Sequence, residues 1–294
     1  MKDLRLYLTL TLLFASGALP VKGQAWGQLS SGPGGNNPVA ENPASNSAPA
    51  AAAAGLTPEQ KRRADMLISV FENSALELQY AYIEDLRDGR GYTAGRAGFC
   101  SGCGDLLLVA ERYTKLKPDN PLAGYLPRLN KLAALASGST AGLDGFPGAW
   151  RQAARDELFR SEQDAVSDEL YYLPALAYAG RLGLQKDFSK IALYEAAIQH
   201  GTGSDPDGLG AMIERASRAA KPPAAGGSER TWLEKFLKVR RAALAHPASA
   251  ATGEAWAESV GRADAMLAIY AAGNMDFSGP VAVAPFGEQF VIPK

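Results

Sequence analysis

Two acidic residues, Glu72 and Asp88, stand in a setting that suits acid/base cleavage of a glycosidic bond. Glu72 closes an amphipathic pattern, and Asp88 opens a Gly-rich turn sixteen residues later. Such hydrolysis needs one carboxyl group that protonates the leaving oxygen and a second group that takes a proton from water. Because paired acids on a surface are usually only solvated, the spacing indicates this chemistry only together with the residues around it.

Those surrounding residues resemble the signature of glycoside hydrolase family 46, the secreted chitosanases. The matching stretches are ENS at 72–74, YIEDLRDGRGYTAGRAGFCSG at 82–102 and GDLL at 104–107. The resemblance covers about 56–294 and is most specific over 70–105. It implies that Glu72 is the general acid and Asp88 the general base, and that Thr93 helps to hold the attacking water.

The same resemblance implies substrate-binding positions outside the acid pair. These positions are Tyr82, Arg90, Asp105, Tyr171 and His200. Asp105 is the acid expected to receive a glucosamine ammonium group. For two of these positions the residue type also fits a purely structural role. Tyr82 could be a core aromatic, and His200 could be a packing or capping residue at a helix end.

Four further residues match structural positions of the family. Trp150 matches a core tryptophan. Glu195, Arg240 and Arg262 match an acid–arginine–arginine network of the family. This network is expected to be buried behind the base and to link the lobes. Glu195 stands where the family usually has aspartate.

Composition divides the chain into three parts. Lys2 and Arg5 precede a short apolar run over 6–19, which predicts a signal peptide over 1–25 and hence a secreted protein. Residues 26–55 are mostly Gly, Pro, Asn, Ser and Ala, so they predict a flexible low-complexity linker. The remaining 56–294 are long enough for one catalytic domain with two lobes.

The periodicity of this domain predicts an α+β fold that is mainly α. Thr57, Pro58 and Gln60 form an N-cap, a first helical proline and a capping-box partner, ahead of a helix that brings Glu72 to its end. Short strands are expected over 79–99 and an extended tail over 281–292. Helical patterns cover 105–116, 121–135, 150–182 with a bend near Pro174, 187–199, 206–220, 228–245 and 254–272. The resemblance implies a two-lobed, lysozyme-like arrangement with a small antiparallel sheet beside the cleft.

Charge and missing motifs narrow the classes of function. The formal net charge is −1, which does not favour nucleic-acid binding, and no later segment has the length of a membrane span. The two histidines form no metal-ligand pattern, and nucleotide-binding loops and a nucleophile elbow are absent from the sequence, so we expect no cofactor and no metal. Acidic residues are in excess over 72–105, which would attract a polycation such as chitosan. We expect a monomer with no membrane partner after signal cleavage.

Cys100 and Cys103 form a C-x-x-C pair. Such a pair is found in redox proteins, but the alternating βαβ pattern typical of those folds is missing here. A local disulfide is the favoured interpretation for an exported chain.

The leading hypothesis is an endo-acting chitosanase that hydrolyses β-1,4 bonds between glucosamine units with inversion. A lysozyme-like muralytic hydrolase is the alternative that shares the fold and the acid pair. A non-catalytic chitosan-binding or redox protein is the alternative from another class.

Overall fold

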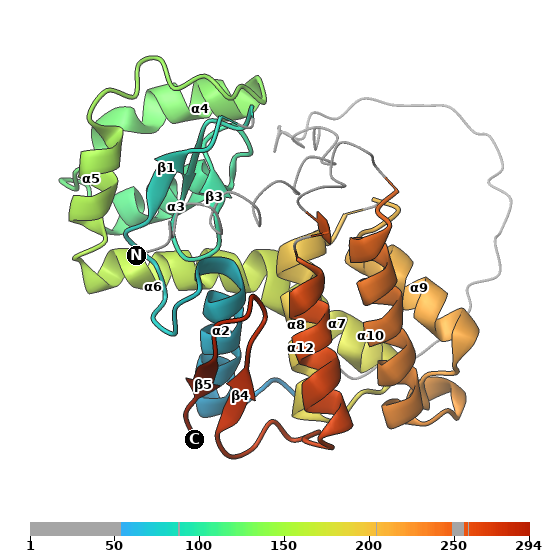
Figure 1. Ribbon diagram of the computed structural model, residues 1–294. Helices are drawn as coiled ribbons and strands as arrows, with labels where there is room; N and C mark the ends of the chain where they lie inside the picture. Colours follow the sequence, from blue (N-terminus) through green and yellow to red (C-terminus); the bar gives the residue numbers. More distant parts are fainter. Residues whose placement is uncertain (1–53, 88, 204, 249–255, 258) are drawn as a thin grey trace, which may run out of the picture.

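The computed structural model describes residues 54–87, 89–203, 205–248, 256–257 and 259–294. Within these ranges the chain forms two lobes, each built around its own cluster of buried hydrophobic side chains (Figure 1). We call them the sheet lobe, residues 80–166, and the helical lobe, which contains residues 56–76 and 171–292. The predicted two-lobed, mainly helical fold with small antiparallel sheets is confirmed.

The sheet lobe carries a three-stranded antiparallel sheet and four helices. Its strands are β1 (Ile83–Asp85), β2 (Tyr92–Ala94) and β3 (Phe99–Cys100), in the order β1-β2-β3. Its helices are α3 (Asp105–Leu116), α4 (Leu126–Ala134), α5 (Phe146–Ala153) and α6 (Glu157–Ser167), with a 3-10 turn η1 (Ala123–Tyr125) before α4. Thr93 lies in the middle strand, paired with Glu84 on one side and Cys100 on the other.

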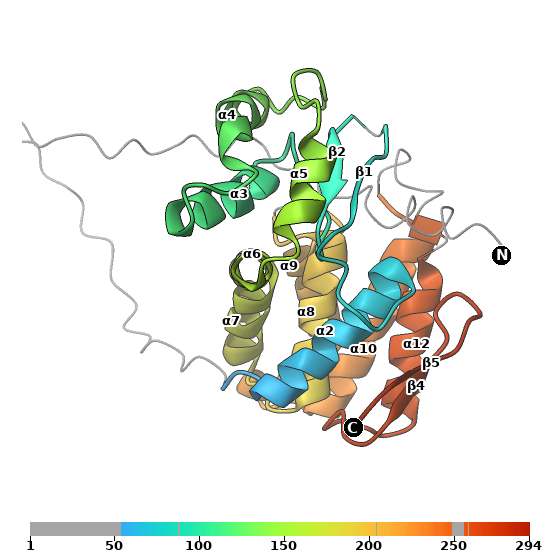
Figure 2. The same cartoon turned by 90° about the vertical axis from the view of Figure 1, so that its left-hand side faces the viewer.

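The helical lobe packs most of its helices around α8, whose residues are almost all buried. Its helices are α2 (Pro58–Asn73), α7 (Leu173–Leu182), α8 (Asp187–His200), α9 (Leu209–Ala219), α10 (Glu229–Ala245) and α12 (Val260–Ala271), with a 3-10 turn η3 (Pro223–Ala225) before α10. The predicted extended tail is a two-stranded antiparallel hairpin, β4 (Val281–Val283) and β5 (Phe290–Ile292), which lies beside α2 (Figure 2).

The start of α2 follows the predicted capping with one correction. The Thr57 hydroxyl accepts the backbone N–H of Gln60, and Pro58 is the first helical residue. The Gln60 side chain does not return to Thr57, because its amide donates instead to the carbonyl of Asp276. The cap is therefore one-sided, and Gln60 ties the helix to the chain before the C-terminal hairpin.

The expected single helix over 150–182 is wrong in its continuity. It is divided into α5, α6, a π-helical turn η2 (Asp168–Tyr172) and α7. The first interruption lies between α5 and α6. There the Asp156 carboxylate accepts the N–H of Leu158 and so caps a new helix. At the second junction Pro174 offers no N–H to the preceding turn, and the wider π turn lies directly before it.

Other helix bounds differ by a few residues. The pattern over 206–220 begins only at Leu209, because the Asp205 carboxylate holds a turn by accepting the N–H of Asp207. The start of the pattern over 254–272 lies outside the described residues, and α12 itself runs from Val260 to Ala271. The predicted stop at Gly201 is confirmed, with a φ of +73° that favours glycine.

Trp150 is a core residue as predicted. It has no exposed surface, and its indole N–H donates to the carbonyl of Tyr80 at 3.0 Å. In the part of the chain that the structure describes, none of the helices has the length and apolar character needed to cross a bilayer. The predicted signal peptide over 1–25 and almost all of the linker over 26–55 lie outside the described residues and stay predictions.

Candidate active site

Glu72 lies in the last turn of α2 and is 9% exposed. The helix ends there because Ser74 adopts a left-handed conformation, with a φ of 49°. The Glu72 carboxylate forms an ion pair with Arg262 of α12, with 2.7 Å between Oε1 and Nη1. The predicted acid is therefore a nearly buried group held by a fixed cation.

Burial decides the protonation of Glu72. Loss of hydration raises the pKa of this carboxyl, and the neighbouring Arg262 guanidinium offsets only part of that increase. Because the net direction is upward, Glu72 keeps its proton to a higher pH than an ordinary glutamate. A carboxyl group in this state is suited to donate a proton at a leaving group.

Behind Glu72 lies the predicted network, and it is fully buried. Glu195 of α8 accepts two hydrogen bonds from Arg262 at 2.7 and 3.0 Å and is also paired with Arg240 of α10. All three side chains have no exposed surface. The expectation placed this network behind Asp88. In the described residues its contact with the catalytic pair is instead through Glu72, because Arg262 binds both glutamates.

His200 stands at the inner end of this network. Arg240 donates to its Nε2 at 3.4 Å, and its ring packs edge-on against Trp256 with centroids 4.9 Å apart. Burial first, and then Arg240 and Arg262, hold the pKa of His200 well below its usual range, so the imidazole is neutral. These contacts are those of a packing histidine at a helix end, and its role in substrate binding stays a prediction.

The sheet lobe supplies Thr93. This side chain has no exposed surface, and its hydroxyl oxygen is buried without a hydrogen-bond partner among the described residues. Such an oxygen is suited to hold a water molecule. Asp88, five residues earlier, lies outside the described residues, so its role as the base stays a prediction.

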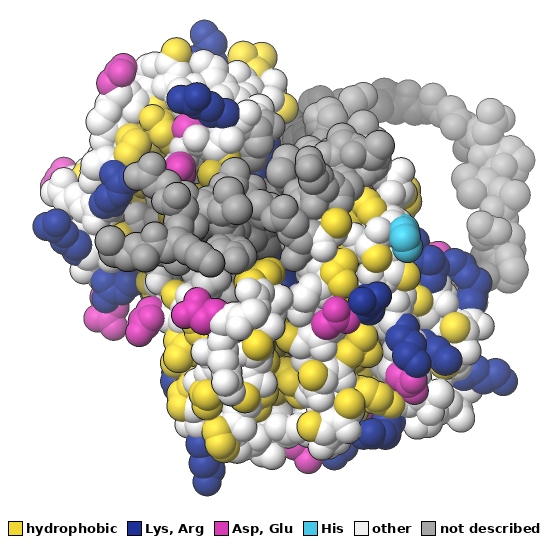
Figure 3. Space-filling model, in the orientation of Figure 1, with side chains coloured by type: hydrophobic (Ala, Val, Ile, Leu, Met, Phe, Trp, Pro, Cys, Tyr) yellow, Lys and Arg dark blue, Asp and Glu magenta, His cyan; other side chains and the backbone are white. Residues whose placement is uncertain are grey.

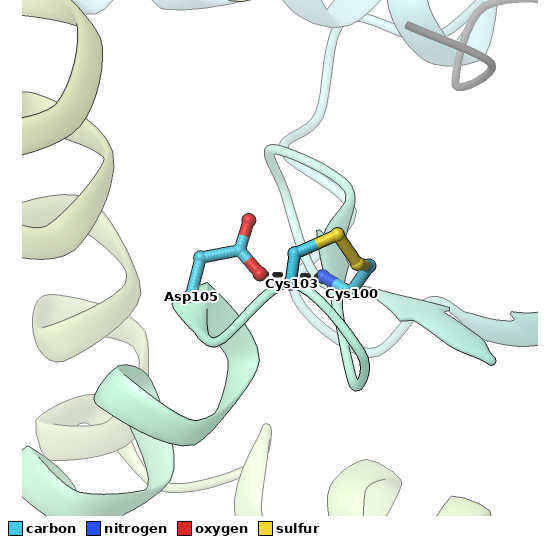
Figure 4. A group of neighbouring side chains, drawn as sticks. All are labelled: Cys100, Cys103 and Asp105. Atoms are coloured by element: carbon cyan, nitrogen blue, oxygen red, sulfur yellow. Dashed lines mark hydrogen bonds between the residues drawn. A yellow bond between two sulfur atoms is a disulfide. The ribbon is translucent and has the colours of Figure 1, made fainter. Parts of the chain in front are cut away.

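Asp105 opens α3 and is held by backbone groups. Its Oδ1 accepts the N–H groups of Cys100 and Leu106, each at 2.8 Å. Its second carboxylate oxygen points away from the disulfide (Figure 4). Burial raises the pKa of Asp105 to about 6, although the backbone hydrogen bonds and Arg90 act in the opposite direction. One oxygen thus fixes the side chain, which sets the direction of the other.

Tyr171 connects the two lobes electrostatically. It lies in the π turn η2, and its phenol has its pKa raised by burial and then by the negative charges of Asp105 and Glu72. Arg90 acts on the same phenol in the opposite direction. Tyr171 is therefore within electrostatic reach of predicted residues from both lobes.

Tyr82 is partly exposed just before β1, with its hydroxyl 3.4 Å from a carboxylate oxygen of Glu84. It is not one of the core aromatics of the sheet lobe, whose core instead contains Trp150 and Phe159. Glu84 and Asp85 of β1 are exposed beside it. On the face shown in Figure 3, acidic and basic side chains are mixed over both lobes, so this face carries no single acidic patch.

Cys100 and Cys103 form a disulfide, with Cα atoms 5.2 Å apart, as the sequence analysis favoured. Their sulfur atoms and an Asp105 oxygen lie within 4.8 Å of one another, a grouping that could hold a metal ion (Figure 4). Because the two sulfurs are bonded to each other, they are not available as thiolate ligands in this state.

A second group of charges was missed by the sequence analysis. Lys61, Asp65 and Arg96 meet with Asp164 and Asp168 where the lobes join. The only sequence signal was the i,i+4 spacing of Lys61 and Asp65, which is typical of an exposed helix pair. No local pattern shows that Arg96, 31 residues after Asp65, completes this group.

Comparison with known proteins places the chain in a family. Residues 66–281 match the model of glycosyl hydrolase family 46. A chitosanase of Bacillus subtilis (strain 168) is 47% identical over 232 residues, which cover 79% of this chain and 84% of that protein.

Two solved structures agree over the described fold. The GH46 chitosanase of Gynuella sunshinyii in complex with chitotetraose has a TM-score of 0.76 and 48% identity, covering 81% of this chain and 99% of that one. A mutant chitosanase from Bacillus subtilis MY002 complexed with 6 GlcN has a TM-score of 0.75 and 45% identity, covering 81% of this chain and 100% of that one. Since the family model matches more than half of the chain and the two-lobed fold is shared, this chain belongs to glycosyl hydrolase family 46, whose chitosanases have a lysozyme-like fold.

Proposed function

We propose that this glycoside hydrolase is a chitosanase that cleaves β-1,4 bonds between glucosamine units inside the chitosan chain and inverts the anomeric centre. The observation that carries the proposal is Glu72. It is a nearly buried carboxyl with a raised pKa at the meeting of two lobes, in a chain similar to chitosanases that bind chitotetraose and 6 GlcN.

In the proposed reaction Glu72 gives its proton to the departing glycosidic oxygen. Asp88, in its ionised form, takes a proton from a water molecule on the opposite face of the sugar, and the Thr93 hydroxyl helps to hold that water. Inversion requires a gap of ~6.5–9.5 Å between the two carboxyl groups, so that the water fits between base and sugar. Arg262 keeps the Glu72 side chain in place and stabilises the negative charge that the Glu72 carboxylate carries after proton transfer.

Asp105 is the proposed receptor for a glucosamine ammonium group. One oxygen is anchored by two backbone N–H groups, so the carboxylate presents its second oxygen in a fixed direction. A fixed carboxylate in a partly desolvated site attracts a cation more strongly than a solvated one. Tyr82, Arg90, Tyr171 and His200 stay proposed substrate-binding residues.

A lysozyme-like muralytic hydrolase is less well supported. Its substrate would need a surface that accepts N-acetyl and lactyl groups, whereas Asp105 acts with its negative charge on the same phenol, Tyr171, as the proposed acid does. Glu84 and Asp85 add exposed acidic groups on β1. We further propose that the protein is secreted, on the basis of the leader-like segment over 1–25.

One experiment tests the substrate, the mode of cleavage and the stereochemistry. The purified protein is mixed with partly acetylated chitosan while NMR follows the anomeric protons of the new ends and viscosity follows the chain length. We expect a rapid fall in viscosity and α-anomeric ends before mutarotation. First-formed β-anomeric ends would exclude inversion, and cleavage of peptidoglycan or chitin in preference to chitosan would exclude the proposed substrate.

A further inference from the structure

A second ionic group, distinct from the one around Glu195, joins the lobes through Arg96. Arg96 lies in the turn between β2 and β3, and only 2% of its side chain is exposed. Its guanidinium bridges two carboxylates: Nη2 lies 2.7 Å from Asp65 of α2, and Nη1 lies 2.6 Å from Asp164 of α6. One buried side chain thus connects the sheet lobe to the first helix of the helical lobe.

Asp65 is fixed from three directions. Besides Arg96, it accepts hydrogen bonds from Lys61 at 2.9 and 3.0 Å and from the Tyr194 hydroxyl at 3.0 Å. Lys61 also reaches Asp168 in η2 at 2.8 Å. Burial lowers the pKa of Arg96, but Tyr194, Asp65 and Asp164 together raise the pKa by more than burial lowers it. The guanidinium therefore stays charged.

The turn that carries Arg96 is itself anchored to α6. The Arg96 N–H donates to the side-chain oxygen of Gln163 at 3.1 Å, and the Gln163 amide donates to the carbonyl of Tyr80 at 3.1 Å. Gly95 has a φ of +73°, and a Cβ there would lie 2.3 Å from the same Gln163 oxygen. The backbone at Arg96 therefore has little freedom to shift.

The position of Asp65 on α2 gives this contact its significance. Asp65 and Glu72 are seven residues apart, so they lie on one face of the helix, about 10 Å apart along its axis. Arg262 holds that face at Glu72, and Arg96 holds it at Asp65. Arg96 also follows Thr93 by three residues, so it links the helix of the proposed acid to the strand of the proposed water-binding residue.

We propose that Arg96 is a positioning residue for Glu72, which sets the distance between the acid on α2 and the water held at Thr93. The inference rests on the proposed function. Without the Arg96–Asp65 contact, α2 stays packed in the helical lobe, but the turn after β2 loses its ion pair to α2, so the distance between Thr93 and Glu72 is less tightly fixed. A shift of about 1 Å at a reacting group costs on the order of 10²-fold in rate.

The test compares Arg96→Met with a matched control on the same helix. Arg63 is also a buried arginine, but it ties α2 to the C-terminal hairpin through the carbonyls of Gly279 and Pro293. Both variants should lose thermal stability. Arg96→Met should lose kcat on chitosan by roughly 10–100-fold, with KM changed by less than about 3-fold, whereas Arg63→Met should keep kcat within about 2-fold. Arg96→Lys should recover most of the lost kcat and also serves if Arg96→Met does not fold.

A double-mutant cycle shows whether Arg96 acts through Glu72. In the Glu72→Gln background, Arg96→Met should cause almost no further loss of the residual rate, because the group that it positions no longer transfers a proton. Additive losses would overturn the proposal. So would a wild-type kcat in folded Arg96→Met, or an Arg96→Lys variant as slow as Arg96→Met.

A measurement without substrate separates this inference from the proposed function. Spin labels are placed at the exposed positions Arg62→Cys on α2 and Lys131→Cys on α4, and the distance distribution between them is measured. Arg96→Met should broaden or shift that distribution, and Arg63→Met should not. An unchanged distribution overturns the inference. If Arg96→Met changes the distribution but the wild-type protein does not cleave chitosan, only the proposed function is overturned.

Discussion

The two lobes hold their functional carboxyl groups by different physical means. In the helical lobe, Glu72 is fixed by a guanidinium that is shared with a second buried glutamate. In the sheet lobe, Asp105 is fixed by backbone N–H groups next to a disulfide. The first arrangement sets a proton affinity through buried charges, and the second sets a direction through turns of the backbone. The proton affinity of the proposed acid, Glu72, therefore depends on the balance of buried charges. The direction of the proposed amine receptor, Asp105, depends on local backbone geometry.

The strongest test of this contrast removes the acid and the base. Glu72→Gln and Asp88→Asn should each lower kcat on chitosan by ~10²-fold or more, because neither amide can exchange the required proton. Both proteins should stay folded and bind chitosan, as amides have the same shape as the carboxylates that they replace. Initial rates and a binding isotherm measure the two effects.

Glu77→Gln is the matched control, since Glu77 is exposed and only five residues after Glu72. It should keep nearly full activity. An active Glu72→Gln protein, or a requirement for Glu77, Glu84 or Asp85, would show that the acid has been assigned to the wrong residue.

Arg262→Met should have the next largest effect, mainly on stability. It leaves Glu72 and Glu195 buried with one fewer cation, and breaking a buried pair in this way costs roughly 3–5 kcal/mol. Because Arg262 lowers the pKa of Glu72, its removal raises that pKa further, so the acid should keep its proton to a higher pH. Urea unfolding and the alkaline limb of the pH–kcat profile measure these changes. Arg241, an exposed arginine paired with Asp264, provides the control as Arg241→Met. Equal losses from the two variants would contradict the importance of the buried network.

Asp105→Asn should have a smaller effect that appears in KM. An uncharged amide cannot attract an ammonium group, so KM for chitosan should rise by about 10-fold, and added salt should mimic part of this loss in the wild type by screening. The pKa of about 6 gives the pH dependence. As the pH falls through 6, Asp105 gains a proton and kcat/KM should decline, and this decline should be missing in Asp105→Asn. A salt-independent KM would exclude the ammonium role.

The raised pKa of Asp105 also makes the free energy of unfolding depend on pH. A buried carboxyl that prefers its proton favours the folded state at low pH, so its contribution is lost as the pH rises from about 4 to 6. Asp105→Asn, which cannot ionise, should lack this loss. Thermal unfolding of the two proteins across this pH range measures the difference, and identical pH profiles would contradict the assigned pKa.

Removal of the disulfide should have the smallest effect. The Cys100→Ser/Cys103→Ser protein should keep most of its chitosanase activity, because the hydrogen bond from residue 100 to Asp105 uses the backbone N–H. Its free energy of unfolding should fall by about 2 kcal/mol at most, since the closed loop is very short. Insulin reduction by the native protein should be absent, and strong reductase activity that disappears in the double variant would restore the redox hypothesis.

Sequence reasoning predicted those features that depend on neighbouring residues. The cap at Thr57, the bounds of α3 and the stop at Gly201 are local and are confirmed. The long helix over 150–182 was wrong because apolar periodicity continues across a junction where Asp156 forms a new cap. The residues of the Glu195 network came from resemblance to a family, and their contact with Glu72 required the structure.

The Arg96 contacts show why the rest was out of reach. Asp65, Arg96 and Asp164 are separated along the chain by 31 and 68 residues, and none of them has a neighbour that indicates burial. An arginine in a Gly-rich turn is usually exposed, so only the packing of α6 against that turn shows its role.

Arg63 connects the first described helix to the C-terminal hairpin, which affects when that helix can fold completely. The guanidinium of this residue in the first described helix donates to the carbonyl of Pro293, 230 positions later in the chain. The chain must therefore be synthesised at least as far as Pro293 before α2 can complete its native contacts. Chains that stop before Pro293 lack this partner, so proteases should cleave them more readily at a loosened first helix.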